Sequence, residues 1–406
     1  MQPEASTIEQ LRGELSRLAR ERLAQAAAAV VEAKQRGGRV AVVVGSGPNL
    51  HEGVSTLVAE LIRVGIVDGV TTSSAVVAHE MAGSLERVKR VPGAEAGVDP
   101  ALLPQDGMFE ISLLPPEQLE MVAAEMPVDR ALMARALAAE GRTIIKAAGN
   151  LSYPLGLRTE RLAREAEVIA RAEGTTVEAV AGRGADPLTM IGAAARRGVP
   201  ALVSIPQLVG GGAVGLAVGD AISTTRRAAL VAELLAGAEV IIESALALTQ
   251  EIHDGPFELH TGHGLWAAWE GARTWSLEGK RLIRIDLDPN LESAWQQERA
   301  SSLVAEAIAR GLPKTKLTGV PFRMEMSGFC RLQGSLPIVG DIGMVWPVLA
   351  AEVSRALGVK LDFICCRQDL PEGQVMRDWI VEHVRPVNRE AMRAAQAATC
   401  AAPGSE

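Results

Sequence analysis

The chain has 406 residues and a hydrophobic content of 48%, enough to bury a large core in two or more lobes. Its net charge of -8, with the basic residues scattered, argues against nucleic acid as the main partner. There is no apolar span of 18 residues and no signal-peptide pattern, and the four cysteines lack disulfide or zinc spacing. We therefore expect a cytoplasmic protein that contacts no membrane.

The predicted elements alternate between strands and helices along most of the chain. A long Ala-rich helix is expected at residues 7–36, either covering a sheet or lying in a subunit interface. Apolar runs predict strands at residues 40–45, 67–72, 142–147, 200–206, 238–243, 282–286 and 336–339. Helical periodicity predicts helices at residues 53–65, 75–90, 128–140, 159–173, 175–182, 186–197, 220–236, 343–357 and 374–384.

This alternation predicts an α/β fold with a doubly wound, mainly parallel, Rossmann-like sheet. Residues 91–127 carry many Pro and Gly residues and are expected to form an excursion or active-site loop. We expect an N-terminal helix within residues 1–36 and an α/β domain at residues 37–388, with insertions near residues 91–183 and 291–334. A flexible tail is expected at residues 389–406.

A glycine-rich turn follows the first predicted strand and is the strongest local signal. Gly45, Ser46, Gly47 and Asn49 come directly after a run of apolar residues, and a helix is predicted soon afterwards. Glycines at such a turn let a ligand approach the backbone, and a helix N-terminus offers free N–H groups to phosphate. The spacing is not G-x-G-x-x-G, but the pattern favours a nucleotide cradle over an ordinary tight turn.

The end of the second predicted strand allows two interpretations. Ser74, His79 and Glu80 follow it, where a doubly wound sheet usually faces the ribose of a dinucleotide. Alternatively, a serine here caps the next helix and the His-Glu pair lies on its surface.

Three later segments add candidates at strand ends. Five glycines within ten residues, including Gly211 and Gly212, follow strand 200–206 and demand unusual backbone angles or a close ligand. Asp220 then either caps the next helix or faces a substrate. Asp286 and Asp341 each follow a predicted strand, which places them at the expected ligand edge.

A histidine-rich loop lies at residues 251–263 and holds three of the six histidines. Its candidate acid–base residues are Glu251, His253, His260 and His263. The H-x6-H-x2-H spacing matches no common zinc pattern, so general acid–base catalysis is favoured over metal binding and no metal is expected.

These motifs, in this order, resemble the archaeal-type ornithine cyclodeaminases. That group is also called the lysine-ketoglutarate reductase/saccharopine dehydrogenase-related family, and it shares its fold with deoxyhypusine synthase. The likeness covers roughly residues 36–85 and 185–355, and segments 43–53, 74–80, 198–204, 281–290 and 336–343 carry it. Two positions depart from the family pattern: Ser74 stands for its Asn, and Glu80 stands for its Asp.

The resemblance implies a deoxyhypusine synthase-like domain with NAD bound at the sheet edge. It places Asn49, Ser74, His79, Glu80 and Asp286 at the cofactor, and Asp220 with the histidine loop at the substrate. It implies hydride transfer at the α-carbon of a small amino or imino acid, with ring closure and ammonia release in the cyclodeaminases. The expected assembly is a homo-oligomer, a dimer or a tetramer.

Two alternatives stay open at this point. Aminoalkyl transfer of the deoxyhypusine or homospermidine synthase type needs a nucleophilic lysine after the glycine-rich strand end, and no Lys lies between Lys146 and Lys280. The second alternative is a non-catalytic NAD-binding protein.

Overall fold

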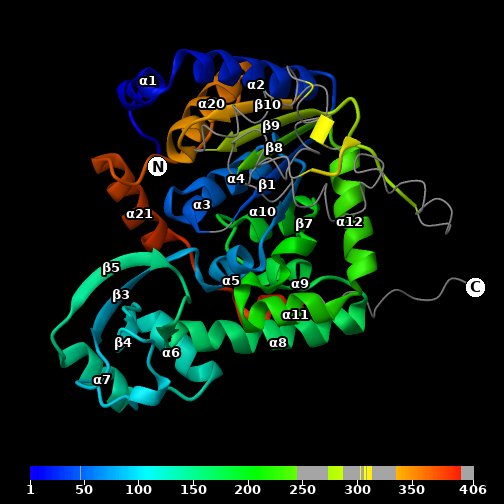
Figure 1. The fold of residues 1–406 in the computed structure, drawn as a ribbon. Coiled ribbons are helices and arrows are strands. Elements are labelled where there is room, and N and C mark those ends of the chain that lie inside the picture. Colours follow the sequence, from blue (N-terminus) through cyan, green and yellow to red (C-terminus); the bar gives the residue numbers. More distant parts are fainter. Residues whose placement is uncertain are drawn as a thin grey trace, which may run out of the picture.

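The computed structural model describes residues 1–45, 47–244, 273–286, 302, 306–307, 309–312 and 335–394. Its centre is a six-stranded sheet, and a separate four-stranded sheet lies beside it (Figure 1). In the part of the chain described, no helix is both long and apolar enough to cross a membrane.

The six-stranded sheet is parallel throughout. It consists of β1 (Val40–Val44), β2 (Gly69–Thr72), β7 (Ala201–Val203), β8 (Val240–Ser244), β9 (Arg281–Asp286) and β10 (Ser335–Val339). The spatial order is β10-β9-β8-β1-β2-β7. Read along the chain this is 3-2-1-4-5-6, the order of doubly wound dinucleotide-binding sheets, so the predicted fold class is confirmed.

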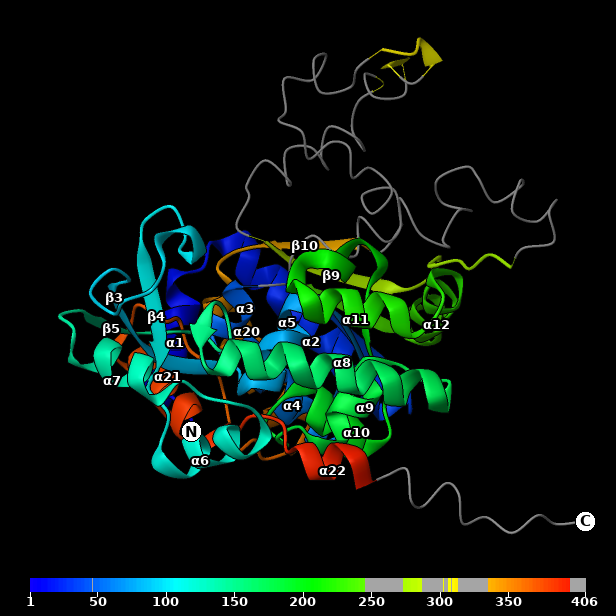
Figure 2. The ribbon, with the colours of Figure 1, turned by 90° about the horizontal axis from the view of Figure 1, so that it is seen from below.

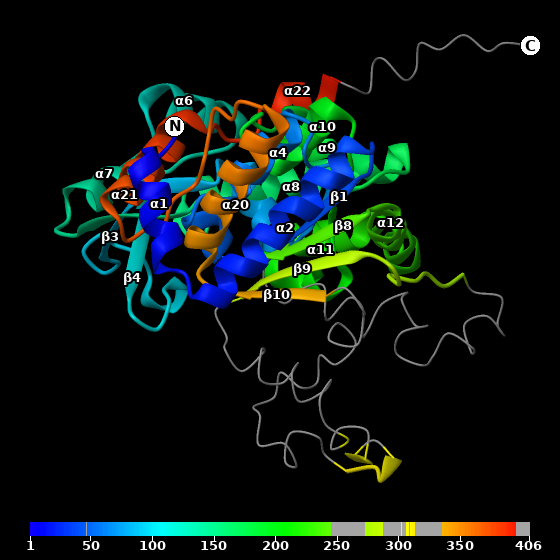
Figure 3. The same cartoon turned by 90° about the horizontal axis from the view of Figure 1, so that it is seen from above.

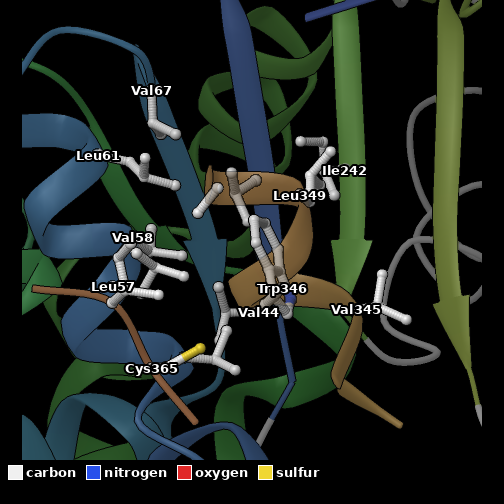
Figure 4. Close-up of a cluster of buried hydrophobic side chains, with 14 of the residues drawn as sticks. Val44, Leu57, Val58, Leu61, Val67, Ile242, Val345, Trp346, Leu349 and Cys365 are labelled. Atoms are coloured by element: carbon white, nitrogen blue, oxygen red, sulfur yellow. The ribbon is translucent and has the colours of Figure 1, made fainter. Parts of the chain in front are cut away.

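Every residue of β1 is buried, and successive side chains of a strand point to opposite faces of the sheet. Both faces of this sheet are therefore covered by helices. Val40, Val42 and Val44 pack in one cluster with residues of α2 (Arg17–Gln35), α4 (Val54–Arg63) and α20 (Ile342–Leu357) (Figures 3 and 4). Ala41 and Val43 pack against residues of α12 (Thr224–Gly237) on the other face.

A second group of helices packs around the β2–β7 side of the sheet (Figure 2). They are α5 (Ser74–Ala82), α8 (Leu155–Glu173), α9 (Val177–Gly184), α10 (Met190–Arg197) and α11 (Ala213–Ala221). The short helices α3 (Pro48–His51) and η2 (Ile205–Gly211) follow β1 and β7, and α22 (Arg389–Ala394) packs against α9.

The smaller sheet has the order β5-β3-β4-β6 and is mostly antiparallel. Its strands are β3 (Leu85–Pro92), β4 (Met108–Ser112), β5 (Arg142–Ala147) and β6 (Ser152–Tyr153). The turn η1 (Pro100–Leu102) and the helices α6 (Pro116–Glu125) and α7 (Arg130–Ala138) lie within the same stretch. From the far end of the chain, α21 (Pro371–His383) packs against β3.

Two predictions for this region are wrong. The helix expected at residues 75–90 ends at Ala82, because Gly83 takes a left-handed conformation with φ 106° and terminates it. The following residues form β3. The loop alternative for residues 91–127 is wrong too, because they contain β4 and α6, but they do form an excursion from the parallel sheet.

Three further boundaries differ from prediction. The helix expected at residues 7–36 is split into α1 (Ala5–Glu14) and α2, since Ser16 caps α2 by accepting from Ala19 N (3.1 Å). Strand 200–206 ends at Val203 and continues as η2. The helix expected at residues 220–236 begins at Thr224, and α11 occupies most of the glycine-rich stretch before it.

Candidate functional site

The carboxyl ends of β1 and β8 define the candidate site. These two strands are adjacent, yet the chain continues from β1 towards β2 and from β8 towards β9, on opposite sides. This reversal is the switch point at which doubly wound sheets bind ligands. We call the edge at which all six strands end the carboxyl edge.

Asn49 holds the two strand ends together at the switch point. Its side-chain nitrogen donates to the carbonyl oxygens of Gly45 (3.1 Å) and Ser244 (3.0 Å). Its oxygen accepts from Ser244 Oγ (2.5 Å), and that hydroxyl also accepts from Trp346 Nε1 (3.0 Å). Since both amide hydrogens of the buried Asn49 are used, its side chain shapes the turn rather than reaching towards a ligand.

The turn itself leaves space for a ligand at Gly47. This residue has φ 48° and ψ -84°, a conformation that strongly favours glycine, and a Cβ built there would meet no atom of the described residues within 4 Å. Gly45 N donates to Ser244 O (3.1 Å), so it belongs to the sheet ladder. Ser46 lies outside the described residues.

The glycine-rich loop after β7 is attached to the start of α5. Ser74 Oγ donates to Gln207 O (3.0 Å) and accepts from Gly211 N (2.9 Å). A Cβ on Gly211 would lie 2.6 Å from Ser74 O, so glycine is required there for close backbone packing. Gly212 follows with φ 59° and ψ -131°. Ser73, rather than Ser74, caps α5 by accepting from Val76 N (3.1 Å).

Glu80 has a different role from the cofactor contact expected of it. Its two carboxylate oxygens accept from the backbone N–H groups of Met190 (2.8 Å) and Ile191 (3.0 Å), at the start of α10. The side chain is fully buried, and burial raises its pKa to about 7 although these hydrogen bonds lower it. Glu80 therefore fixes α10 against α5 and is not available to a ligand.

Asp220 does not lie where the sequence prediction needs it. It is exposed in the last turn of α11, where its nearest cation is Arg164 at 4.0 Å. At ~1.5 Å per residue, eight residues of helix separate it from Gly212 by roughly 12 Å. The expected contact with a substrate at the carboxyl edge is therefore corrected.

Asp286 and Asp341 each lie at or just after the end of a strand of the parallel sheet, as predicted. Asp341 caps α20, with its Oδ1 accepting from Gly343 N (2.7 Å). Asp286 ends β9 opposite Val339 of β10, at the carboxyl edge. Glu251, His253, His260 and His263 lie outside the described residues. Within the described ranges, no group of three His, Cys, Asp or Glu side chains could hold a metal ion.

A group of basic side chains lies where the smaller sheet meets the carboxyl edge, and the sequence indicates His79 alone among them. We call His51, His79, Lys146 and Arg377 the cationic cluster. They come from α3, α5, β5 and α21, and Arg377 Nη2 lies 3.5 Å from His51 Nδ1. No local sequence signal joins them, because the docking of the smaller sheet brings them together.

His79, expected at the cofactor, is a half-buried member of this cluster. Its Nδ1 lies 2.8 Å from Ala148 O. A carbonyl oxygen only accepts, so Nδ1 carries the proton and Nε2 is the acceptor of the neutral ring. Burial lowers the pKa of His79 most, and the charge of Lys146 lowers it further, against the hydrogen bond that raises it. Its ring is therefore neutral near pH 7.

Glu52 is a buried acid beside the glycine turn. Burial raises its pKa to about 7, although its Oε2 accepts from Gln368 N (2.7 Å). Asp341 and Asp369 also raise it. An acid with this pKa, between the turn after β1 and the start of α20, can exchange a proton near neutral pH.

A scan of protein-family models and a search of curated proteins give no match. Among solved structures, the chain is similar to ArgZ, an arginine dihydrolase from the ornithine–ammonia cycle in cyanobacteria, at 12% identity and TM-score 0.35. That comparison covers 82% of this chain and 32% of ArgZ. The chain is also similar to AgrE in its ternary complex with ornithine and NAD+, at 13% identity and TM-score 0.39, covering 88% of this chain and 34% of AgrE.

A third similar structure is a protein from Methanococcus maripaludis S2 described as LOR/SDH, at 11% identity and TM-score 0.34. It covers 87% of this chain and 69% of that protein. The chain thus spans about one third of the length of ArgZ and AgrE. With identities and TM-scores this low, the comparisons establish neither a family nor an activity, and the resemblance seen in the sequence stays a prediction.

Proposed function

We propose that this chain is an NAD-dependent enzyme that transfers a hydride at the α-carbon of a small amino or imino acid. One observation carries the proposal. The sheet has the 3-2-1-4-5-6 strand order, and its glycine turn lies at the switch point with open space above Gly47. The resemblance to ornithine cyclodeaminases supports the finer version, in which ring closure releases ammonia.

The residues at the carboxyl edge fit a dinucleotide. Gly47 allows close approach to the backbone, and the Ser74–Gly211 contact fixes the neighbouring loop. Ser204 Oγ, just after β7, is buried and has no hydrogen-bond partner among the described residues. When bound, NAD supplies the hydride acceptor.

The chain itself must handle the proton of the substrate's ammonium group. Nε2 of His79 is an acceptor in a ring that is neutral near pH 7, so it can take this proton before hydride transfer. Glu251, His253, His260 and His263 remain proposals for the same task. We also propose a homo-oligomer, a dimer or a tetramer, which light scattering after size-exclusion chromatography would test.

Calorimetric titration with NAD+ tests the cofactor proposal, using two matched variants. Gly37 and Gly47 lie at opposite ends of β1, and both have positive φ with no atom within 4 Å of the position that a Cβ would take. Gly37→Ala therefore serves as the control for alanine at a glycine with positive φ away from the turn. We expect only Gly47→Ala to weaken NAD+ binding, by about tenfold or ~1.4 kcal/mol.

If the unaltered protein binds no NAD+ and releases none on denaturation, the cofactor proposal fails. If both variants weaken binding equally, the glycine turn is not the cradle. Where NAD+ binds, amino acids such as ornithine are then screened for reduced nicotinamide and for ammonia. Ammonia without net reduction identifies cyclodeamination, and net reduction identifies an oxidoreductase.

A further inference from the structure

The cationic cluster is assembled by one short stretch of the smaller sheet. Ile145 O accepts from Arg377 Nη2 (2.6 Å), and Ala148 O accepts from His79 Nδ1. Lys146, between them, donates from its Nζ to Asn150 O (2.8 Å). Backbone carbonyls at the end of β5 thus hold His79 of α5 and Arg377 of α21 close to α3.

Arg377 has no counter-ion among the residues that the structure describes. Among the described residues, no carboxylate lies within ion-pair distance of its guanidinium, and its Nε is buried without a hydrogen-bond partner. Partial burial lowers the pKa of Arg377, although the charges of Glu52 and Asp378 raise it. An arginine held in this way is costly unless an anion completes its hydrogen bonds.

The acids near the cluster are already engaged. Glu52 and Asp378 act on Arg377 only at longer range. Glu52 directs its Oε2 to Gln368 N, and Asp378 pairs with Arg87. Lys146 shares Glu110 with Arg90.

The remaining donors suit the oxygens of one anionic group. His51 presents Nδ1 to Arg377, so its neutral ring keeps Nε2–H as a donor. Burial lowers the pKa of His51, and so do the charges of Arg377, His79 and Lys146. Arg377 Nη1, His51 Nε2–H and the third proton of Lys146 Nζ, which also contacts Glu110 and Asn150 O, are the donors left for carboxylate or phosphate oxygens.

We infer that Arg377, His51 and Lys146 form a subsite for one anionic group of the ligand, a carboxylate of the substrate or a phosphate of the cofactor. The identity of that ligand rests on the proposed function, whereas the binding of an anion at these three residues does not. It adds a residue from the far end of the chain to the site, since Arg377 belongs to α21.

The test uses the full chain with Arg377→Gln, which keeps a side-chain donor but removes the charge. Arg87→Gln is the matched control, because it breaks the Arg87–Asp378 pair across the same α21–β3 contact and leaves the cluster intact. Thermal shifts are recorded with acetate and with inorganic phosphate, against chloride at equal ionic strength. We expect saturable stabilisation in the unaltered protein and in Arg87→Gln, and a roughly 10- to 100-fold weaker apparent affinity in Arg377→Gln.

Nucleotide titrations identify the source of the anionic group. If Arg377→Gln leaves NAD+ and NADP+ binding unchanged while acetate binding is lost, the subsite takes a substrate carboxylate. If the variant loses affinity for NADP+ or NAD+, it takes a cofactor phosphate. If neither anion stabilises the unaltered protein beyond chloride, or Arg377→Gln responds like Arg87→Gln, the inference is overturned. Failure of NAD+ binding alone would refute the proposed function and leave the anion result standing.

Discussion

Asn49 and Ser244 are hydrogen-bonded to each other in both directions. The amide of Asn49 donates to the Ser244 carbonyl, and the Ser244 hydroxyl donates back to Asn49 Oδ1. The pair bridges β1 and β8, two neighbouring strands that are far apart in the sequence. The floor of the switch point is therefore fixed by side chains as well as by the sheet ladder.

Replacement of Asn49 tests this bridge. Asn49→Ala removes the side-chain donor to Gly45 O and Ser244 O and the acceptor of the Ser244 hydroxyl, although Ser244 O keeps its bond from Gly45 N. We therefore expect a loss of about 2–4 kcal/mol in the free energy of unfolding. Asn49→Asp should cost more, because a carboxylate cannot donate to Gly45 O or Ser244 O. The measurement is urea unfolding. The exposed Asn150→Ala should change stability by less than ~0.5 kcal/mol. An Asn49→Asp variant as stable as the unaltered protein would mean that the amide does not donate.

Gly211 and Gly219 provide a second matched pair. A methyl group at Gly211 would lie 2.6 Å from a backbone oxygen of Ser74, whereas at Gly219 it would meet nothing within 4 Å. We expect Gly211→Ala to destabilise the protein by about 1–3 kcal/mol through this overpacking. Gly219→Ala, inside α11, should be neutral or stabilising by up to ~1 kcal/mol. Equal effects on the thermal unfolding midpoint would contradict the attachment of the glycine loop to α5.

Stability should fall as pH rises from about 4.5 to about 7. Glu52 and Glu80 have an ordinary pKa of 4.5, and in the folded protein it is raised to about 7. The unfolded chain therefore loses these protons first, and the stabilisation present below pH 4.5 is gone above pH 7. At about 1.4 kcal/mol per pH unit, each group accounts for roughly 3 kcal/mol at most.

Glu52→Gln is the test of this pH dependence. Glutamine stays neutral and its oxygen can keep the hydrogen bond from Gln368 N. Urea unfolding at a series of pH values should give a flatter slope for this variant between about pH 4.5 and 7. An exposed acid such as Glu306 serves as the control, and Glu306→Gln should leave the slope unchanged. An unchanged slope in Glu52→Gln would show that its carboxyl ionises normally.

Cys365 and Cys366 should resist thiol reagents in the native protein. Both are fully buried, and burial raises the pKa of both thiols, that of Cys366 to about 11. Because the thiolate is the reactive form, we expect no reaction at about pH 8 before unfolding and two equivalents afterwards. The measurement uses a variant in which Cys330 and Cys400, which lie outside the described residues, are replaced by serine. Rapid modification of the native variant would contradict the burial.

The parallel sheet could be predicted because its strands are continuous apolar runs, the mark of strands buried on both faces. The smaller sheet could not be predicted as a separate sheet, although its strand β5 was expected at residues 142–147. The β3 sequence Leu85–Pro92 alternates irregularly between buried and half-buried positions and directly follows a helical pattern. A single glycine, Gly83, marks the boundary between the two, and one glycine is also tolerated inside a helix.

The candidate site also contains some features that the sequence could predict and others that it could not. The place of the glycine turn could be predicted, since it follows a buried strand directly, whereas the bonds of Asn49 to Ser244 could not. The role expected of Glu80 is wrong because its partner, the start of α10, is distant in the sequence and only packing brings the two together. Arg377 carries no sequence signal at all, for its neighbours come from β5 and α3.

The position of α21 has a consequence for how the protein is made. The smaller sheet is complete by Tyr153, so its strands can pair while the ribosome is still translating the parallel sheet. The helix that packs against β3 begins only at Pro371, after the last strand of the parallel sheet. A nascent chain therefore carries an uncovered β3 surface and an incomplete cationic cluster until residues 371–383 have been synthesised. Premature termination before residue 371 would release a product with its main sheet built and this junction left open.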